Sequence, residues 1–81
     1  MEDTKKVIRT YILEEFLPGE NPEELTDSTP LITGGILDSL ATLKLVAFLE
    51  ERFQITIQAH ETMVDYLNTV SDIATLVRSK L

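Results

Sequence analysis

Residues 39–53 read SLATLKLVAFLEERF, and this stretch decides the fold of the 81-residue chain. Its apolar side chains recur at helical spacing. The apolar face comprises Leu40, Leu43, Val46, Ala47 and Phe53, widened by Leu45 and Leu49. Asp38 precedes the stretch as a natural N-cap, which places Ser39 at the first helical position. We therefore predict an amphipathic helix over residues 39–53 whose stripe of Leu40, Leu43 and Phe53 faces the core.

Two more long helices flank this stretch. Residues 5–17 carry a helical stripe that Asp3 or Thr4 caps and Pro18-Gly19 ends; its members are Ile8, Tyr11, Ile12 and Phe16. Near the C-terminus, residues 69–72 resemble a capping box that opens a last helix. Its inward positions are Val70, Ile73, Ala74, Val77 and Leu81.

The connections between these helices differ in length. Residues 18–38 form a long loop with three prolines and three glycines, and loops of this length in compact domains are usually functional. We expect four apolar side chains to pin it to the core: Leu25, Leu31, Ile32 and Ile36. Residues 55–57 alternate as an extended link, and residues 60–66 form a short helix. Met63 is expected to fill a gap, with Tyr11 and Tyr66 in the core or at its boundary. The sequence thus predicts an all-α fold, a small four-helix bundle with three main helices and one short helix, as a single domain over residues 1–81.

Composition narrows the possible functions. Apolar residues are 43% of the chain, as in folded globular proteins, and there is no cysteine. Disulfides and thiolate metal sites are therefore excluded, and we predict no metal site. The longest apolar run, residues 45–49, is too short to span a bilayer, and the first residues do not resemble a signal peptide. These features favour a cytoplasmic protein that does not enter membranes, and the lack of an exposed heptad favours a monomer.

The net charge of -7 is concentrated in the middle of the chain. Residues 20–65 hold nine acidic side chains against Lys44 and Arg52. A negative surface repels nucleic-acid backbones, so we expect no nucleic-acid partner. The acidity either steers encounters with basic patches on partner proteins or serves solubility alone.

Ser39 is the candidate functional residue. A catalytic serine needs a base and a group that orients the base, but the chain has one histidine, His60, and lacks the nucleophile-elbow pattern. We expect His60 to face solvent, and we predict no catalytic residue. Modification of the Ser39 hydroxyl fits better, because a helix N-terminus favours a phosphate group by about 0.3–1 kcal/mol. Gly34-Gly35 gives the preceding backbone room for a modifying enzyme to approach. Asp38 is expected to cap the helix. As an alternative, its carboxylate helps to orient the magnesium of the modifying enzyme.

Residues 35–40, GILDSL, followed by the apolar helix that ends in Phe53, resemble the attachment motif of acyl and peptidyl carrier proteins. The resemblance covers almost the whole chain. It implies a helical bundle whose Ser39 receives 4′-phosphopantetheine from coenzyme A through a phosphopantetheinyl transferase that uses magnesium. The arm's thiol would carry acyl or aminoacyl groups as thioesters. Acyl-, aminoacyl- or ketosynthase-type enzymes would dock on the second helix, around Leu40 and Lys44.

The resemblance is incomplete in one respect. Fatty-acid-synthesis carriers usually have acidic residues early in the second helix, where this chain has Ala41 and Lys44; only Glu50 and Glu51 match. This difference favours a specialised carrier, in a polyketide or nonribosomal peptide pathway, over housekeeping fatty-acid synthesis. A D-alanyl or other aminoacyl carrier is an alternative, and so is an unmodified acidic helical interaction module.

Overall fold

The structure is a computed structural model that describes residues 4–19 and 21–81. It contains four α-helices: α1 (Thr4–Phe16), α2 (Ser39–Phe53), α3 (Val64–Leu67) and α4 (Val70–Ser79). Two short 3-10 helices, η1 (Pro22–Glu24) and η2 (Ala59–Thr62), interrupt the connections. The described residues form no strand, so the all-α prediction is confirmed.

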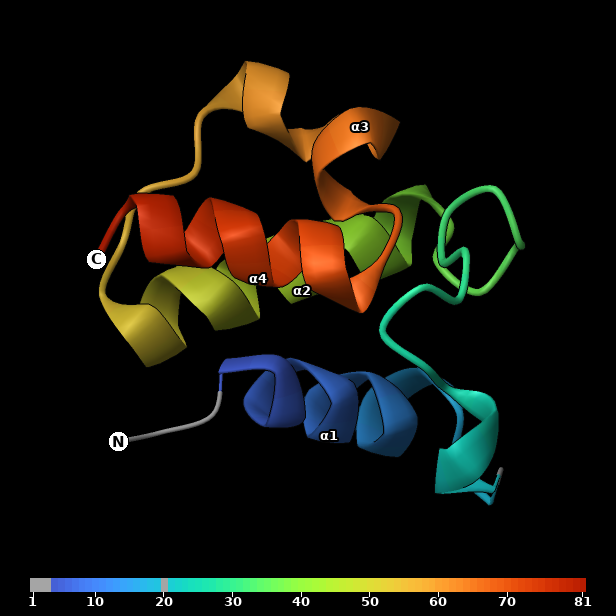
Figure 1. Cartoon of the computed structure of the whole chain (residues 1–81). Helices are drawn as coiled ribbons and strands as arrows, with labels where there is room; N and C mark the ends of the chain where they lie inside the picture. Colours follow the sequence, from blue (N-terminus) through green and yellow to red (C-terminus); the bar gives the residue numbers. More distant parts are fainter. Residues whose placement is uncertain (1–3, 20) are drawn as a thin grey trace.

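The helices enclose one apolar core. Figure 1 shows α1 along one side of α2 and α4, with α3 on the opposite side. Every α-helix and the long first loop contribute buried side chains. They are Ile8, Ile12, Leu25, Leu31, Leu37, Ala41, Leu45, Leu49, Ile57, Leu67, Val70, Ile73, Ala74, Leu76 and Val77. A fully buried leucine or isoleucine contributes about 1.5–3 kcal/mol, so the loop is held by the same force as the helices.

The face that α2 turns to the core differs from the prediction. Its buried residues are Ala41, Leu45 and Leu49, four positions apart, whereas Leu40 and Leu43 are 63% and 64% exposed. Apolar residues lie nearly all round this helix, so spacing alone does not select one face. The partners of the helix select it, because Tyr11 of α1 stacks on Phe48 with ring centroids 3.9 Å apart.

The helix ends follow the sequence closely. α2 spans the predicted residues, and Thr69 caps α4 by accepting a hydrogen bond from the Asp72 N–H at 3.0 Å. Thr4 is a buried first residue of α1, and Asp3 lies outside the described residues. Within the described part of the chain, no helix is both long and apolar enough to cross a membrane.

Three predictions near the C-terminal half were wrong. The expected helix over residues 60–66 is split into η2 and α3 at Met63, which is 62% exposed and fills no gap. Tyr66, by contrast, is 40% exposed, which fits the boundary position expected for it. Leu81 is 71% exposed because α4 ends at Ser79 and its stripe does not reach the last residue.

Candidate functional site

Ser39 lies at the first position of α2, and its side chain is exposed. Asp38 caps the helix: its Oδ1 accepts a hydrogen bond from the Ala41 N–H at 2.8 Å, and its carbonyl accepts one from the Thr42 hydroxyl at 2.8 Å. Within the described residues no hydrogen bond engages the Ser39 hydroxyl. The predicted cap is confirmed, and Asp38 leaves Ser39 as the accessible group at the helix start.

The loop before Ser39 is held by Asn68, at the C-terminal end of α3. Its backbone carbonyl accepts a hydrogen bond from the Leu31 N–H at 2.6 Å. Its side-chain oxygen accepts hydrogen bonds from the N–H groups of Ile32 and Thr33, both at 3.0 Å. The Leu31 carbonyl in turn accepts from Ile36 and Leu37. Asn68 thus anchors the turn that leads into α2.

The two glycines of this turn have distinct roles. Gly35 has a φ of 82°, in the left-handed region that favours glycine. At Gly34 an added Cβ would lie 2.2 Å from the carbonyl oxygen of Pro30, which is too close for any side chain. The turn itself therefore requires both glycines, whatever room they leave for a modifying enzyme.

Asp27 fixes the middle of the same loop. Its carboxylate pairs with Arg9 and lies 3.4 Å from the Lys5 ammonium, both on α1, while its carbonyl accepts a hydrogen bond from the Ser71 N–H at 3.1 Å. Partial burial raises the pKa of Asp27, but the hydrogen bonds and charges of Arg9 and Lys5 outweigh it, so the pKa is lowered. The loop is thereby linked to α1 and α4 at once.

Two further acidic side chains are engaged inside the molecule. Glu50 accepts a hydrogen bond from the Ile57 N–H at 2.9 Å, which ties the link after α2 back to the helix. Glu61 lies 2.7 Å from the Lys80 ammonium and accepts from the Gln58 N–H. These two hydrogen bonds lower the pKa of the Glu61 carboxyl.

Comparison with known proteins identifies the family. A family model described as a phosphopantetheine attachment site matches residues 10–77. The chain is also similar to the D-alanyl carrier proteins of Streptococcus suis strains 98HAH33 and 05ZYH33. Each is 37% identical over 71 residues, which cover 88% of this chain and 86% of the relative. This chain belongs to the phosphopantetheine-binding carrier proteins. Membership implies a covalently attached 4′-phosphopantetheine, and a transferase and acyl- or aminoacyl-handling enzymes as the general kinds of partner.

The start of α2 fits such a group in this carrier. A phosphate diester needs an accessible hydroxyl and favourable electrostatics, and the exposed Ser39 hydroxyl supplies the first. The N–H groups of the first helical turn have no acceptor within the helix, and they favour a negative group there. Four surface hollows of about 260–400 Å³ lie elsewhere, and none of these four is lined by Ser39.

The described residues do not assemble a hydrolase site around Ser39. His60 is exposed, as predicted, and its ring lies edge-on to that of Tyr66 with centroids 6.3 Å apart. No described hydrogen bond joins His60 to Ser39. Among residues 4–19 and 21–81, no cluster of three or more histidine or acidic side chains is arranged to hold a metal ion.

The sequence singles out Ser39 and predicts the Asp38 cap, but it gives no indication of Asn68. The only local signal at Asn68 is an asparagine just before the cap of the last helix. Its hydrogen-bond partners lie 35 and 36 residues earlier in the chain, so no short pattern reveals them.

Proposed function

We propose that this protein is an aminoacyl carrier of the D-alanyl type, with its 4′-phosphopantetheine on Ser39. The observation that carries the cargo assignment is the 37% identity to D-alanyl carrier proteins over most of both chains. The match covers 71 of the chain's 81 residues. The comparisons give no comparable support to a polyketide or nonribosomal peptide role, so the aminoacyl alternative replaces that preference.

Ser39 is the attachment residue on three grounds. It is the serine of the GILDSL stretch that resembles the family's attachment motif. Its exposed hydroxyl is free of hydrogen bonds to other described residues, and it stands at the N-terminus of the longest helix. When bound, the arm supplies a thiol that holds the cargo as a thioester, which a chain without cysteine cannot otherwise do.

The residues of the chain itself position and present the arm. Asp38 satisfies the Ala41 N–H, and Asn68 holds the preceding turn, so the Ser39 Oγ has a fixed location for the transferase. An aminoacyl cargo carries an ammonium group, whose burial in an apolar core is costly. The cargo is therefore presented at the surface, and the bundle is a non-catalytic support.

Mass spectrometry tests the attachment. Incubation with coenzyme A, magnesium and a broad-range phosphopantetheinyl transferase should add one phosphopantetheine to the wild-type chain. The Ser39→Ala variant should remain unmodified, whereas Ser28→Ala, at an exposed serine of the first loop, should be modified like the wild type. Modification of the Ser39→Ala variant would place the arm elsewhere.

A loading assay tests the cargo. The modified protein, ATP and a D-alanine-activating ligase should yield a D-alanyl thioester that hydroxylamine releases. The same ligase should leave the unmodified protein uncharged. Loading of a fatty acid or another amino acid by its own ligase, with none of D-alanine, would contradict the assignment.

A further inference from the structure

Asn68 joins the end of α3 to the attachment turn, residues 31–37, which lies directly before Asp38 and Ser39. We propose that Asn68 is a positioning residue for the attachment step alone. It holds the attachment turn in the conformation that the transferase recognises, and it has no part in the later loading of the thiol. The proposal rests on the proposed carrier function and separates the two reactions that the protein undergoes.

The attachment turn is closed at its ends but open in its middle. The Leu31 carbonyl accepts hydrogen bonds from the N–H groups of Ile36 at 2.8 Å and Leu37 at 2.9 Å. Leu31 and Leu37 are buried, whereas residues 32–36 are half-buried or exposed. Apolar packing therefore fixes the two ends of the turn and leaves its middle to be held in another way.

Asn68 provides this hold. In the described part of the chain, all hydrogen bonds between the attachment turn and other elements end on this residue. Its side-chain oxygen accepts from the N–H groups of Ile32 and Thr33 at 3.0 Å and from the Thr33 hydroxyl at 3.4 Å. Its backbone carbonyl accepts from the Leu31 N–H at 2.6 Å. A substitution of Asn68 thus releases the middle of the turn, while the backbone bond to Leu31 is retained.

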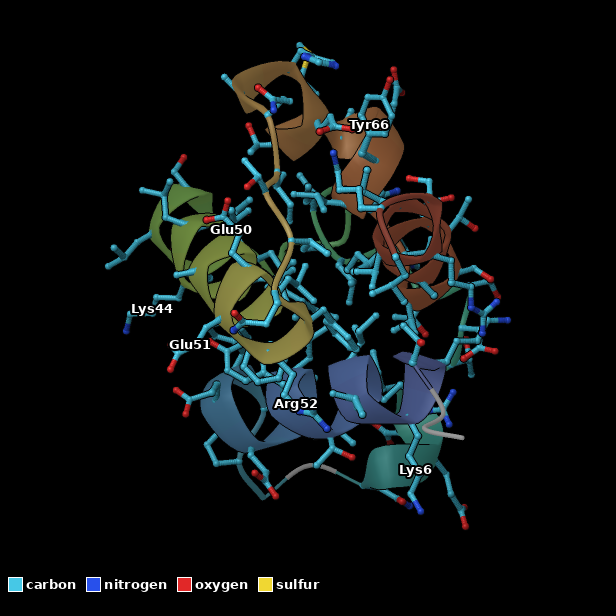
Figure 2. The ribbon with its side chains drawn as sticks, turned by 90° about the vertical axis from the view of Figure 1, so that its left-hand side faces the viewer. Lys6, Lys44, Glu50, Glu51, Arg52 and Tyr66 are labelled. Carbon is cyan, nitrogen blue, oxygen red and sulfur yellow. The ribbon has the colours of Figure 1, made fainter. Side chains whose placement is uncertain are left out.

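The anchor itself is rigid. Asn68 is the C-cap of α3, and its N–H donates to the Val64 carbonyl at 3.1 Å. Its neighbour Leu67 is completely buried, and so is Val70 at the start of α4. Figure 2 shows Tyr66 pointing away from the bundle, so α3 directs its other side to the core. Because a rotation of α3 would expose Leu67, Asn68 imposes the position of the turn and does not follow it.

Attachment depends on this geometry. The Ser39 Oγ forms a bond to the phosphorus that bears pantetheine, and the pyrophosphate bond of coenzyme A breaks. Adenosine 3′,5′-bisphosphate leaves, and the hydroxyl proton passes to a base of the transferase. Such a transfer requires the attacking and leaving oxygens in line. A loosely held turn leaves only a fraction of the molecules in the recognised conformation, which raises KM in proportion and leaves kcat unchanged.

Loading depends far less on the attachment turn. The thiol stands at the far end of a flexible arm, whose rotating bonds bring it to a ligase whether or not the turn is held. The start of α2 is also independent of Asn68, because Asp38 caps it through Ala41 and Thr42. An Asn68 variant that already carries the arm should therefore be loaded like the wild type.

Steady-state kinetics with a broad-range phosphopantetheinyl transferase test the proposal, with the unmodified chain as the varied substrate. Asn68→Ala should raise KM for the chain roughly tenfold and leave kcat unchanged. Asn68→Asp keeps an oxygen acceptor and should restore KM at neutral pH. Thr69→Ala is the matched control, because it removes the acceptor of the Asp72 N–H and weakens the cap of α4. Its KM should equal that of the wild type.

Hydrogen exchange gives a second readout that needs no enzyme. The N–H groups of Ile36 and Leu37 should exchange roughly tenfold faster in Asn68→Ala than in Thr69→Ala, because the turn opens locally. A purely structural role of Asn68 predicts the same acceleration in both variants. Asn68→Gln, whose amide oxygen is displaced by one methylene, should behave like Asn68→Ala, and it replaces that variant if circular dichroism shows Asn68→Ala to be unfolded.

The outcomes separate the positioning role from the carrier function. A wild-type KM in Asn68→Ala, or an equal increase in Asn68→Ala and Thr69→Ala, would overturn the role of Asn68. Slower loading of Asn68→Ala that already carries the arm, by the ligase that charges the wild type, would also overturn it. A wild-type chain that gains no arm rejects the carrier assignment and this proposal with it. A wild-type chain that gains the arm but accepts no D-alanine rejects only the cargo, and the KM values still decide the role of Asn68.

Discussion

Asn68 offers a single side-chain oxygen, and two backbone N–H groups of the first loop converge on it. Ile32 and Thr33 each donate to this oxygen at 3.0 Å, and Leu31 donates to the backbone carbonyl of the same residue. Removing the side chain would leave two loop N–H groups without their acceptor. Because a partly buried donor without a partner is destabilising, the residue that follows α3 sets the stability of the turn that leads to Ser39.

We therefore predict that Asn68→Ala lowers the free energy of unfolding by roughly 1–3 kcal/mol. Asn68→Asp keeps an oxygen acceptor in the same place, so its free energy of unfolding should fall clearly less at neutral pH. Urea unfolding followed by circular dichroism measures both variants. A loss for Asn68→Ala no greater than for Asn68→Asp would show that these hydrogen bonds do not hold the loop.

At the scale of elements, the sequence predicts features that are determined within one stretch of the chain. It misses features that depend on residues far apart in the chain. The bounds of α2 follow from a cap and an apolar run within one stretch, and both were confirmed. Which face of α2 is buried depends on Tyr11 of another helix, so Leu40 and Leu43 were wrongly placed in the core. Ser39 is singled out by the sequence because its signal is local. Asn68 was missed, since Ile32 and Thr33, whose N–H groups it accepts from, lie 36 and 35 residues earlier in the chain.

The turn before α2 allows a second prediction. Gly34→Ala should destabilise the protein by roughly 1–3 kcal/mol, because its Cβ meets the Pro30 carbonyl in a packed turn. Gly35→Ala tests backbone strain without this clash, because a Cβ at residue 35 meets no atom within 4 Å although the φ is positive. We expect this variant to lower the free energy of unfolding by only about 1–2 kcal/mol. Thermal unfolding of the two variants checks the difference. Stability of Gly34→Ala equal to that of the wild type would show that the turn is not packed against Pro30.

For the molecule as a whole, ion pairs hold together parts that are far apart in the chain. Asp27 joins the first loop to α1, and Glu61 joins η2 to the residue after α4. Each link pairs an acidic side chain with a basic one. The links that organise the loops therefore also make the fold sensitive to acid.

The sign of that sensitivity follows from the pKa of the two carboxyls, both lowered from ordinary values of 3.8 for Asp27 and 4.5 for Glu61. A carboxyl with a lowered pKa in the folded state binds protons less readily than in the unfolded chain. Its contribution to stability is complete above the ordinary value and is lost as the pH falls through the lowered one.

We expect the free energy of unfolding to decline as the pH drops below about 4.5, and the decline to be shallower in the double variant Asp27→Asn, Glu61→Gln. That variant should also be less stable than the wild type at pH 7. Glu23→Gln, at an exposed site of η1, should leave the pH profile unchanged. Urea unfolding between pH 7 and pH 3 measures all three, and parallel profiles for the wild type and the double variant would contradict the role of these ion pairs.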